Sequence, residues 1–184
     1  AANLIDRAAP ITVKAAPPYV SRGGVKLAKA LREFAIEVAG KNAIDIGAST
    51  GGFTDCLLAH GAAKVIAVDV GYGQLDWKLR NDARVLVLEK TNIRYLDPAC
   101  LPFVPELATI DASFISLKLI LPKVRSLISP EGTVVALIKP QFEVGKGKVG
   151  KGGVVRSAGE HNRVIDEISL AAVDCGYQIG RAHV

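Results

Sequence analysis

The sequence has few cysteines and no long apolar segment, and each absence excludes a class of protein. Its three cysteines, Cys56, Cys100 and Cys175, are far apart and form no CxxC pair. This spacing argues against a disulfide framework or a metal site and suits a reducing, cytoplasmic location. The longest strongly apolar stretches, such as Thr133–Ile138, are too short to cross a bilayer. The N-terminus lacks the layout of a signal peptide, so no stable membrane association is expected.

Acidic residues are scarce in two segments of the chain, although the formal net charge is only +5. Arg7–Arg32 contains six basic and no acidic side chains, and Lys139–Arg156 contains five basic side chains and Glu143. If the two segments meet in space, they form a basic face of the kind that binds phosphates. Two separate solvated stretches explain the charge equally well. The charge pattern alone leaves both interpretations open.

Strands and helices are expected to alternate after residues 1–20, which contain three prolines, show little periodicity and are predicted to be a linker. Apolar residues recur at helical spacing from Gly24 until Gly40 ends the run. The predicted strands are Ala43–Ile46, Lys64–Asp69, Val85–Glu89, Ala108–Asp111 and Thr133–Ile138, and the further predicted helices are Thr54–His60, Leu119–Ile128 and His161–Cys175. Strands this apolar are expected to be buried on both faces. The alternation predicts an α/β fold over 21–184, with a mostly parallel, doubly wound, Rossmann-like sheet.

A glycine-rich loop follows the first predicted strand. Glycine there lets the backbone turn sharply and approach a ligand. Ser49 stands where a dinucleotide-binding motif has its second glycine, and no Walker lysine follows. Asp45 lies at the strand end, where it could meet a cationic group, and Asp69 ends the second strand, where a carboxylate can accept both ribose hydroxyls.

The loop and Asp69 together indicate a nucleoside cofactor without a phosphate, S-adenosylmethionine. A tight turn with no ligand is the alternative, which Asp69 makes less favourable. The cofactor-binding residues predicted along the loop are Asp45, Gly47, Ala48, Ser49, Thr50, Gly51, Gly52, Phe53 and Thr54.

Polar residues also end the fourth and fifth predicted strands. Asp111 and Lys139 stand where an open parallel sheet lines its ligand crevice. Lys26 lies in the first turn of the first predicted helix and, taken alone, is more often a surface lysine. Together the three residues suit methylation of a ribose 2′-hydroxyl. A lysine can act as the base there only if partial burial or a nearby cation lowers its pKa.

Long motifs in this order resemble the hemolysin-A-type (TlyA-like) ribosomal RNA 2′-O-methyltransferases, relatives of the FtsJ-type enzymes. The motifs are YVSRGGVKL (Tyr19–Leu27), DIGASTGGFTDCLL (Asp45–Leu58), DVGYGQLDWKLR (Asp69–Arg80), EKTNIRYL (Glu89–Leu96), IDASFISLKLILP (Ile110–Pro122) and IKPQFEVGKGKVGKGGVVR (Ile138–Arg156). The resemblance implies transfer of a methyl group from S-adenosylmethionine to a cytidine ribose in ribosomal RNA, or in ribosomal subunits.

The resemblance also implies roles for individual residues. Of a Lys-Asp-Lys-Glu catalytic set, the first three fall on Lys26, Asp111 and Lys139. Further cofactor contacts are implied at Asp69, Val70, Thr91, Asn92 and Asp111, and RNA contacts at Arg22, Lys26, Lys146, Lys148, Lys151 and Arg156. The family usually has an N-terminal S4-type RNA-binding domain, of which Ile11–Lys14 would be the last strand, so residues 1–20 are expected to be its remnant. The set's glutamate has no counterpart before Val184, so the domain is expected to lack its last strands.

Two functions of other classes remain as alternatives. A cytolysin, the activity behind the family's historical name, would need an exposed amphipathic or membrane-length segment. The predicted helix His161–Cys175 has an apolar face suited to covering a sheet and no basic stripe. A nucleotide-binding oxidoreductase is disfavoured by Ser49 in the glycine loop.

Overall fold

Five parallel strands form a single sheet in this computed structural model, which describes residues 17–145, 147–150 and 152–180. The strands are β1 (Asn42–Ile46), β2 (Lys64–Val68), β3 (Val85–Leu88), β4 (Leu107–Ile110) and β5 (Thr133–Ala136). Their order is β3-β2-β1-β4-β5, and every neighbouring pair is parallel. The predicted parallel α/β fold is confirmed. The order reverses between β1 and β4, and open sheets of this kind bind ligands beyond the carboxyl ends of the strands at that point.

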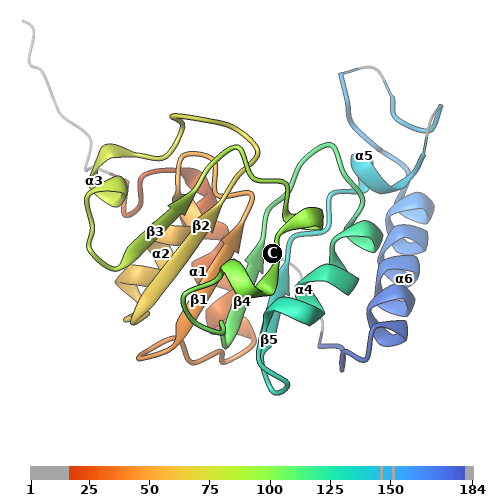
Figure 1. Ribbon diagram of the computed structural model, residues 1–184. Coiled ribbons are helices and arrows are strands. Elements are labelled where there is room, and N and C mark those ends of the chain that lie inside the picture. The colour runs from red at the N-terminus through yellow and green to blue at the C-terminus, as the bar shows by residue number, and fades with distance from the viewer. Residues whose placement is uncertain (1–16, 146, 151, 181–184) are drawn as a thin grey trace, which may run out of the picture.

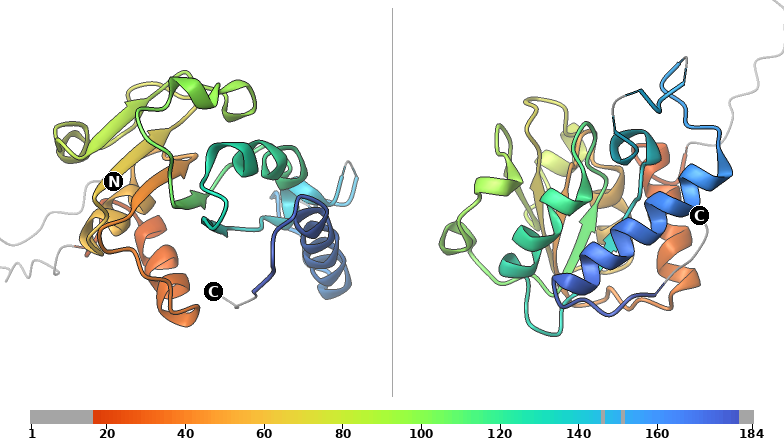
Figure 2. Two further views of the ribbon diagram at one scale, coloured as in Figure 1. Left: turned by 60° about the horizontal axis from the view of Figure 1, so that its bottom comes forward. Right: turned by 90° about the vertical axis from the view of Figure 1, so that its right-hand side faces the viewer.

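Helices cover both faces of the sheet (Figures 1 and 2). The helices are α1 (Arg22–Glu33), α2 (Gly52–Ala59), α3 (Trp77–Arg80), α4 (Leu121–Leu127), α5 (Pro140–Glu143) and α6 (Ala158–Asp174). Short 3-10 helices form at η1 (Ile93–Tyr95), η2 (Pro98–Cys100) and η3 (Leu117–Leu119). One apolar core lies between the sheet and α1 and α2, and the other between the sheet and α4 and α6.

Alternate residues of the central strands point into opposite cores. Val65 and Ala67 of β2 pack with α1 and α2, whereas Ile66 and Val68 pack with the core of α4 and α6. Burial on both faces is therefore confirmed for β1, β2 and β4. It is wrong for β3 and β5, whose residues are mostly half-buried, because these strands form the two edges of the sheet.

Two predicted helices differ from the observed ones. The first ends at Glu33 rather than near Gly40, because Ala35 adopts a left-handed conformation with φ +50° that breaks the run. Val38 lies in the loop that follows and is buried in the same core as the apolar residues of α1. It therefore continued the apolar pattern of the helix in the sequence without belonging to the helix. The helix predicted over Leu119–Ile128 is shorter: α4 forms only at Leu121–Leu127, and Leu119 is the last residue of η3. The predicted strand Ile11–Lys14 lies outside the described residues.

Candidate functional site

The glycine loop between β1 and α2 turns through left-handed backbone conformations. Gly47 and Gly51 have φ of +84° and +94°, and Ser49 adopts +49°. A Cβ atom on Gly47 would lie 3.0 Å from the backbone of Asp111 and Ala112. Glycine is therefore required at this position both for the turn and for the close approach of the loop to the chain after β4.

Asp45 lies beneath this loop and is fully buried. Its Oδ2 accepts a hydrogen bond from Thr54 Oγ1 at 2.7 Å, and its Oδ1 accepts one from Thr109 Oγ1 at 3.1 Å. Burial raises the pKa of Asp45 to about 6, although both hydrogen bonds oppose the shift. The carboxylate was expected to meet a cationic group. Instead it joins β1 to α2 and β4, and supports the loop from below.

Asp69 stands at the other side of the loop, directly after β2. Its Oδ2 accepts from the backbone N of Ser49 at 2.7 Å, and its Oδ1 accepts from the backbone N of Gly71 at 2.6 Å. The side chain is only partly buried. Each carboxylate oxygen retains acceptor capacity, so Asp69 can still accept hydroxyl donors.

The remaining predicted cofactor residues flank Asp69. The backbone N of Thr91 donates to Asp69 O at 2.9 Å, which brings the segment after β3 beside the end of β2. Asn92 caps η1 by accepting from the backbone N of Arg94 at 3.1 Å. Val70 is strongly exposed. The structure thus gathers Asp69, Val70 and Thr91 at the same edge of the sheet as the loop.

The start of α1 packs directly on the glycine loop. A Cβ atom on Gly52 would lie 2.1 Å from Ser21 Oγ and 2.9 Å from the backbone N of Gly24. Ser21 caps α1, and its hydroxyl accepts from the backbone N of Gly23 at 3.3 Å. The absence of a side chain at Gly52 therefore fixes how closely the helix that carries Lys26 approaches the loop.

Lys139 and Asp111 form an ion pair beyond the ends of β5 and β4. The Lys139 Nζ lies 2.6 Å from Asp111 Oδ1, and the two side chains are 18% and 23% exposed. The geometry of this contact is not that of a hydrogen bond, and Asp111 Oδ1 has no hydrogen-bond donor among the described residues. Lys139 Nζ instead donates to Asp111 O at 3.0 Å and to Ser113 Oγ at 2.9 Å.

Lys26 reaches the same place from α1. It lines a cavity of about 340 Å³ together with Lys139 and the residues on either side of Lys139. The structure therefore brings the three predicted catalytic residues to one edge of the sheet, with two lysines at one cavity and an aspartate paired to one of them. The two basic segments meet here, at Lys26 and Lys139.

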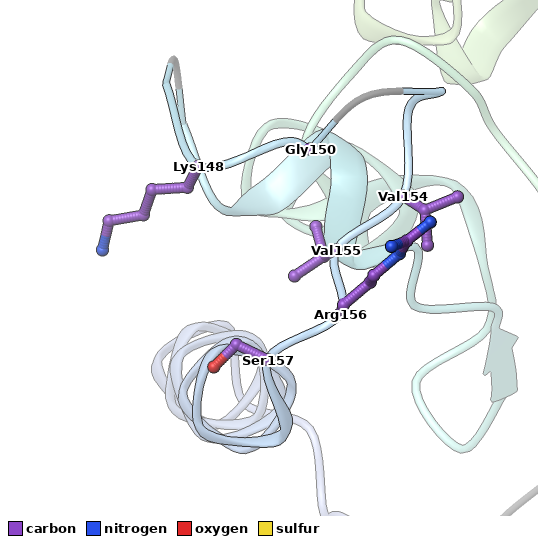
Figure 3. Close-up of a pocket in the computed structure, with 6 residues that line it drawn as sticks. All are labelled: Lys148, Gly150, Val154, Val155, Arg156 and Ser157. Carbon is purple, nitrogen blue, oxygen red and sulfur yellow. The ribbon is translucent and has the colours of Figure 1, made fainter.

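The predicted RNA-binding residues lie at two places. Arg22 is exposed in the first turn of α1, near Lys26. Lys148 and Arg156 line a second cavity, of about 200 Å³, at the start of α6, and their side chains point in different directions (Figure 3). Lys148 Nζ pairs with Glu160 Oε1 at 3.1 Å. Lys146 and Lys151 lie outside the described residues.

Some polar and aromatic residues at the site carry no signal that marked them in the sequence. Ser113 accepts from Lys139, and Glu143 accepts from Ser116 and Leu117. Phe114 is 91% exposed and left-handed, with φ +63°, a conformation that costs a non-glycine residue energy. Only the fold shows that these residues, which follow β4 and β5, lie close to one another.

Comparison with known proteins places these residues in a family. The model of the FtsJ-like methyltransferase family matches residues 19–182. YqxC of Bacillus subtilis, named as a candidate rRNA methyltransferase, is 57% identical over 94% of this chain and 62% of its own length. The 16S/23S rRNA (cytidine-2′-O)-methyltransferase TlyA of Mycobacterium tuberculosis is 52% identical over 86% of this chain and 59% of its own length. This chain thus spans about 60% of the length of these curated relatives.

Solved structures support the same fold. A Streptococcus thermophilus protein named as a candidate hemolysin has a TM-score of 0.85 and 50% identity, over 88% of this chain and 59% of its own. An S-adenosylmethionine-dependent methyltransferase from Mesorhizobium loti has a TM-score of 0.57 at 18% identity, over 83% of this chain and 81% of its own, and shares the fold alone. The match to a methyltransferase family disfavours the oxidoreductase alternative. The chain belongs to the FtsJ-like methyltransferase family.

Proposed function

We propose that this chain is the methyl-transferring part of an enzyme that methylates ribose 2′-hydroxyls of cytidines in ribosomal RNA. The observation that carries the proposal is the Lys139–Asp111 ion pair beside the glycine loop, with Lys26 at the same cavity. A ribose hydroxyl is a very weak acid, so its methylation needs a base and a cationic surrounding at the reacting oxygen. The two lysines and the aspartate provide both kinds of group.

Each of the three residues has a distinct role in this proposal. Lys139 Nζ, once it has released its own proton to solvent, accepts the proton of the 2′-hydroxyl. Asp111 holds the Lys139 amine in place before and after the proton moves. Lys26, across the cavity, supplies a nearby cation that favours release of the Lys139 proton and stabilises the developing alkoxide.

The residues around the glycine loop fit S-adenosylmethionine. The loop carries no basic side chain for a phosphate, and Asp69 is partly exposed with acceptor capacity for ribose hydroxyls. Gly47–Thr54, Asp69, Val70, Thr91 and Asn92 would hold the cofactor. When bound, it would supply an electrophilic methyl group for transfer to the ribose oxygen.

Ribosomal RNA as the substrate is supported by the charge distribution and by the relatives. TlyA of Mycobacterium tuberculosis is named for methylating cytidines of 16S and 23S rRNA, and TlyA of Campylobacter jejuni for 23S rRNA. In this chain Arg22, Lys26, Lys148 and Arg156 are exposed cations that can contact phosphates near the site. We place the reaction in the cytoplasm, where ribosomes are accessible.

Two measurements test the proposal. Mass mapping of ribosomal RNA from cells with and without the gene should show the loss of a cytidine 2′-O-methyl group. Calorimetry should show binding of S-adenosylmethionine or its demethylated product. A variant that carries a side chain at position 47 in place of Gly47 should lose this binding. Unchanged RNA methylation, or binding of a dinucleotide in place of S-adenosylmethionine, would overturn the proposal.

A membrane-acting cytolysin remains the second candidate, because Hemolysin A of Brachyspira hyodysenteriae is 45% identical over 87% of this chain. Among the described residues, no helix combines the length and apolarity that crossing a membrane requires. Val164, Ile168 and Ala172 of α6 are buried in the core of α4 and α6. Leakage of dye from vesicles at concentrations that methylate RNA would support this function; methylation without leakage would reject it.

A further inference from the structure

The segments that carry Asp111 and Lys139 lie beyond the paired part of the sheet. Backbone pairing between β4 and β5 extends to the bond from Leu137 N to Ile110 O, at 2.9 Å. After that point the chain following β4 and the chain following β5 are held together by side chains. The relative position of the two catalytic groups therefore depends on those side-chain contacts.

Glu143 makes the contact farthest from the strand ends. Its Oε2 accepts from Ser116 Oγ at 2.5 Å, and its Oε1 accepts from the backbone N of Leu117 at 2.8 Å. Both donors belong to the segment after β4, whereas Glu143 ends α5, four residues after Lys139. A single carboxylate thus joins the two segments, although Glu143 lies 27 residues after Ser116 and 26 after Leu117 in the sequence.

The surroundings of Glu143 make this junction rigid. The Ser116 hydroxyl also caps η3 by accepting from the backbone N of Lys118 at 3.2 Å. Leu117 and Val144, which flank the hydrogen bonds, are buried in the same apolar core. The carboxylate and one of its donors thus lie next to residues that the core holds, so the Glu143 hydrogen bonds limit how far the segments can move apart.

Between Glu143 and the ion pair lies one further contact. The rings of Phe114 and Phe142 have centroids 5.0 Å apart, and Lys139 Nζ lies 5.9 Å from the Phe142 ring. Phe114 is left-handed and strongly exposed. A strained conformation persists when its surroundings determine it, and the hydrogen bonds of Glu143 fix the chain two residues after Phe114.

We propose that Glu143 is a positioning residue for methyl transfer: it holds the segment with Asp111 close enough to Lys139 for Asp111 to orient the Lys139 amine. This inference rests on the proposed function. We assign Glu143 no role in taking the proton, because its hydrogen bonds run to Ser116 and Leu117 and those of the proposed base Lys139 run to Asp111 and Ser113. Small displacements of reacting groups reduce rates steeply, so a loosened junction should act on the chemical step.

The test compares Glu143→Ala with Glu143→Gln in the full-length protein, with transfer of labelled methyl groups to ribosomal RNA as the assay. We expect Glu143→Ala to lower kcat by about 10- to 100-fold, with an almost unchanged KM for RNA. Its calorimetric affinity for S-adenosylmethionine should stay near that of wild type. Glutamine keeps an acceptor for the backbone N of Leu117 and can donate to the Ser116 hydroxyl, so Glu143→Gln should restore most of kcat.

Two further variants control for folding. Glu131→Ala removes an exposed glutamate in the turn before β5, at the amino ends of the strands and away from the site, and should have wild-type kcat. Ser116→Ala removes the hydroxyl that donates to Glu143 from the segment after β4. It should also lower kcat, by a smaller factor than Glu143→Ala. It decides the question if Glu143→Ala fails to fold.

The outcomes separate this inference from the proposed function. Ribose methylation absent from the wild-type protein overturns the proposed function, and this inference with it. Wild-type methylation with full kcat in Glu143→Ala, or in Ser116→Ala where the first variant does not fold, overturns only the positioning role. Equal losses in Glu143→Ala and Glu143→Gln, or a parallel loss of cofactor affinity, also overturn it.

Discussion

At the end of β1 the glycine loop lies directly against the backbone of the chain after β4, whereas at the ends of β4 and β5 the polar residues meet through side chains. We call Asp45–Thr54 with Asp69 the loop side, and Asp111–Leu117 with Lys139–Glu143 the lysine side. The loop side is held by a fully buried aspartate and by glycines that admit no side chain. The lysine side is held by a partly exposed ion pair and the contacts of Glu143.

The difference suits the two tasks that we propose. A cofactor site that recognises one small molecule benefits from a backbone shape that cannot vary. A site for a large RNA must stay open to solvent on one side, so its groups are only partly buried. Changes on the loop side should therefore alter stability and cofactor binding, and changes on the lysine side should alter the rate of transfer.

The largest effect is expected for Lys139→Ala. It removes the proposed base, a contribution worth about 100- to 10,000-fold in rate, while leaving the loop side intact. Methyl transfer to ribosomal RNA in the full-length protein should fall by that order, with the calorimetric affinity for S-adenosylmethionine preserved. The matched control is Lys41→Ala, which removes a lysine directly before β1, at the amino ends of the strands. Transfer near the wild-type rate in Lys139→Ala would remove Lys139 from the mechanism.

The second effect concerns Asp45 and stability. Burial raises the pKa of Asp45 from 3.8 to about 6, so the folded state binds more protons than the unfolded state between these values. The contribution of Asp45 is thus most favourable below pH 4 and is lost as the pH rises through 6, by at most about 3 kcal/mol. Urea unfolding of wild type and Asp45→Asn should show a difference in the free energy of unfolding that changes between pH 4 and 6 and is constant above pH 6. A pH-independent difference would contradict the assignment.

A smaller effect is expected for Gly52→Ala. The new Cβ would press on Ser21 and the backbone of Gly24, and such overpacking costs about 1–3 kcal/mol. Both the free energy of unfolding and cofactor affinity should fall, because the loop and the start of α1 must move apart. Gly159, in the first turn of α6, has only an ordinary contact at 3.7 Å. Gly159→Ala should therefore cause no loss; equal losses in the two variants would show that the close approach at Gly52 is unimportant.

The smallest effect is expected for Lys148→Ala. Its ion pair with Glu160 is exposed, and such pairs add little to stability, so the melting temperature should stay at the wild-type value. If Lys148 contacts an RNA phosphate, the slope of log affinity against log salt should decrease by about one. An unchanged slope in filter-binding titrations would place the RNA elsewhere.

Much of the loop side follows from the sequence. Glycines after an apolar strand and an acid at the end of the next strand are local patterns with a direct backbone reason, and the structure places Gly47, Gly51 and Asp69 at one edge. The role of Asp45 could not be read in this way. Its partner Thr109 is 64 residues away and becomes its neighbour only through the pairing of β1 with β4.

The strands, the parallel sheet and the positions of Lys26, Asp111 and Lys139 at strand or helix ends can be predicted from the amino-acid pattern, because hydrophobic period and polar strand ends are local properties. Three features follow only from the folded chain: Lys26 shares a cavity with Lys139, Glu143 joins two segments, and β3 and β5 are only half-buried. These features depend on the strand order and on contacts between distant residues. Local preference cannot encode them, since the segments that Glu143 joins become neighbours only through the pairing of β4 with β5.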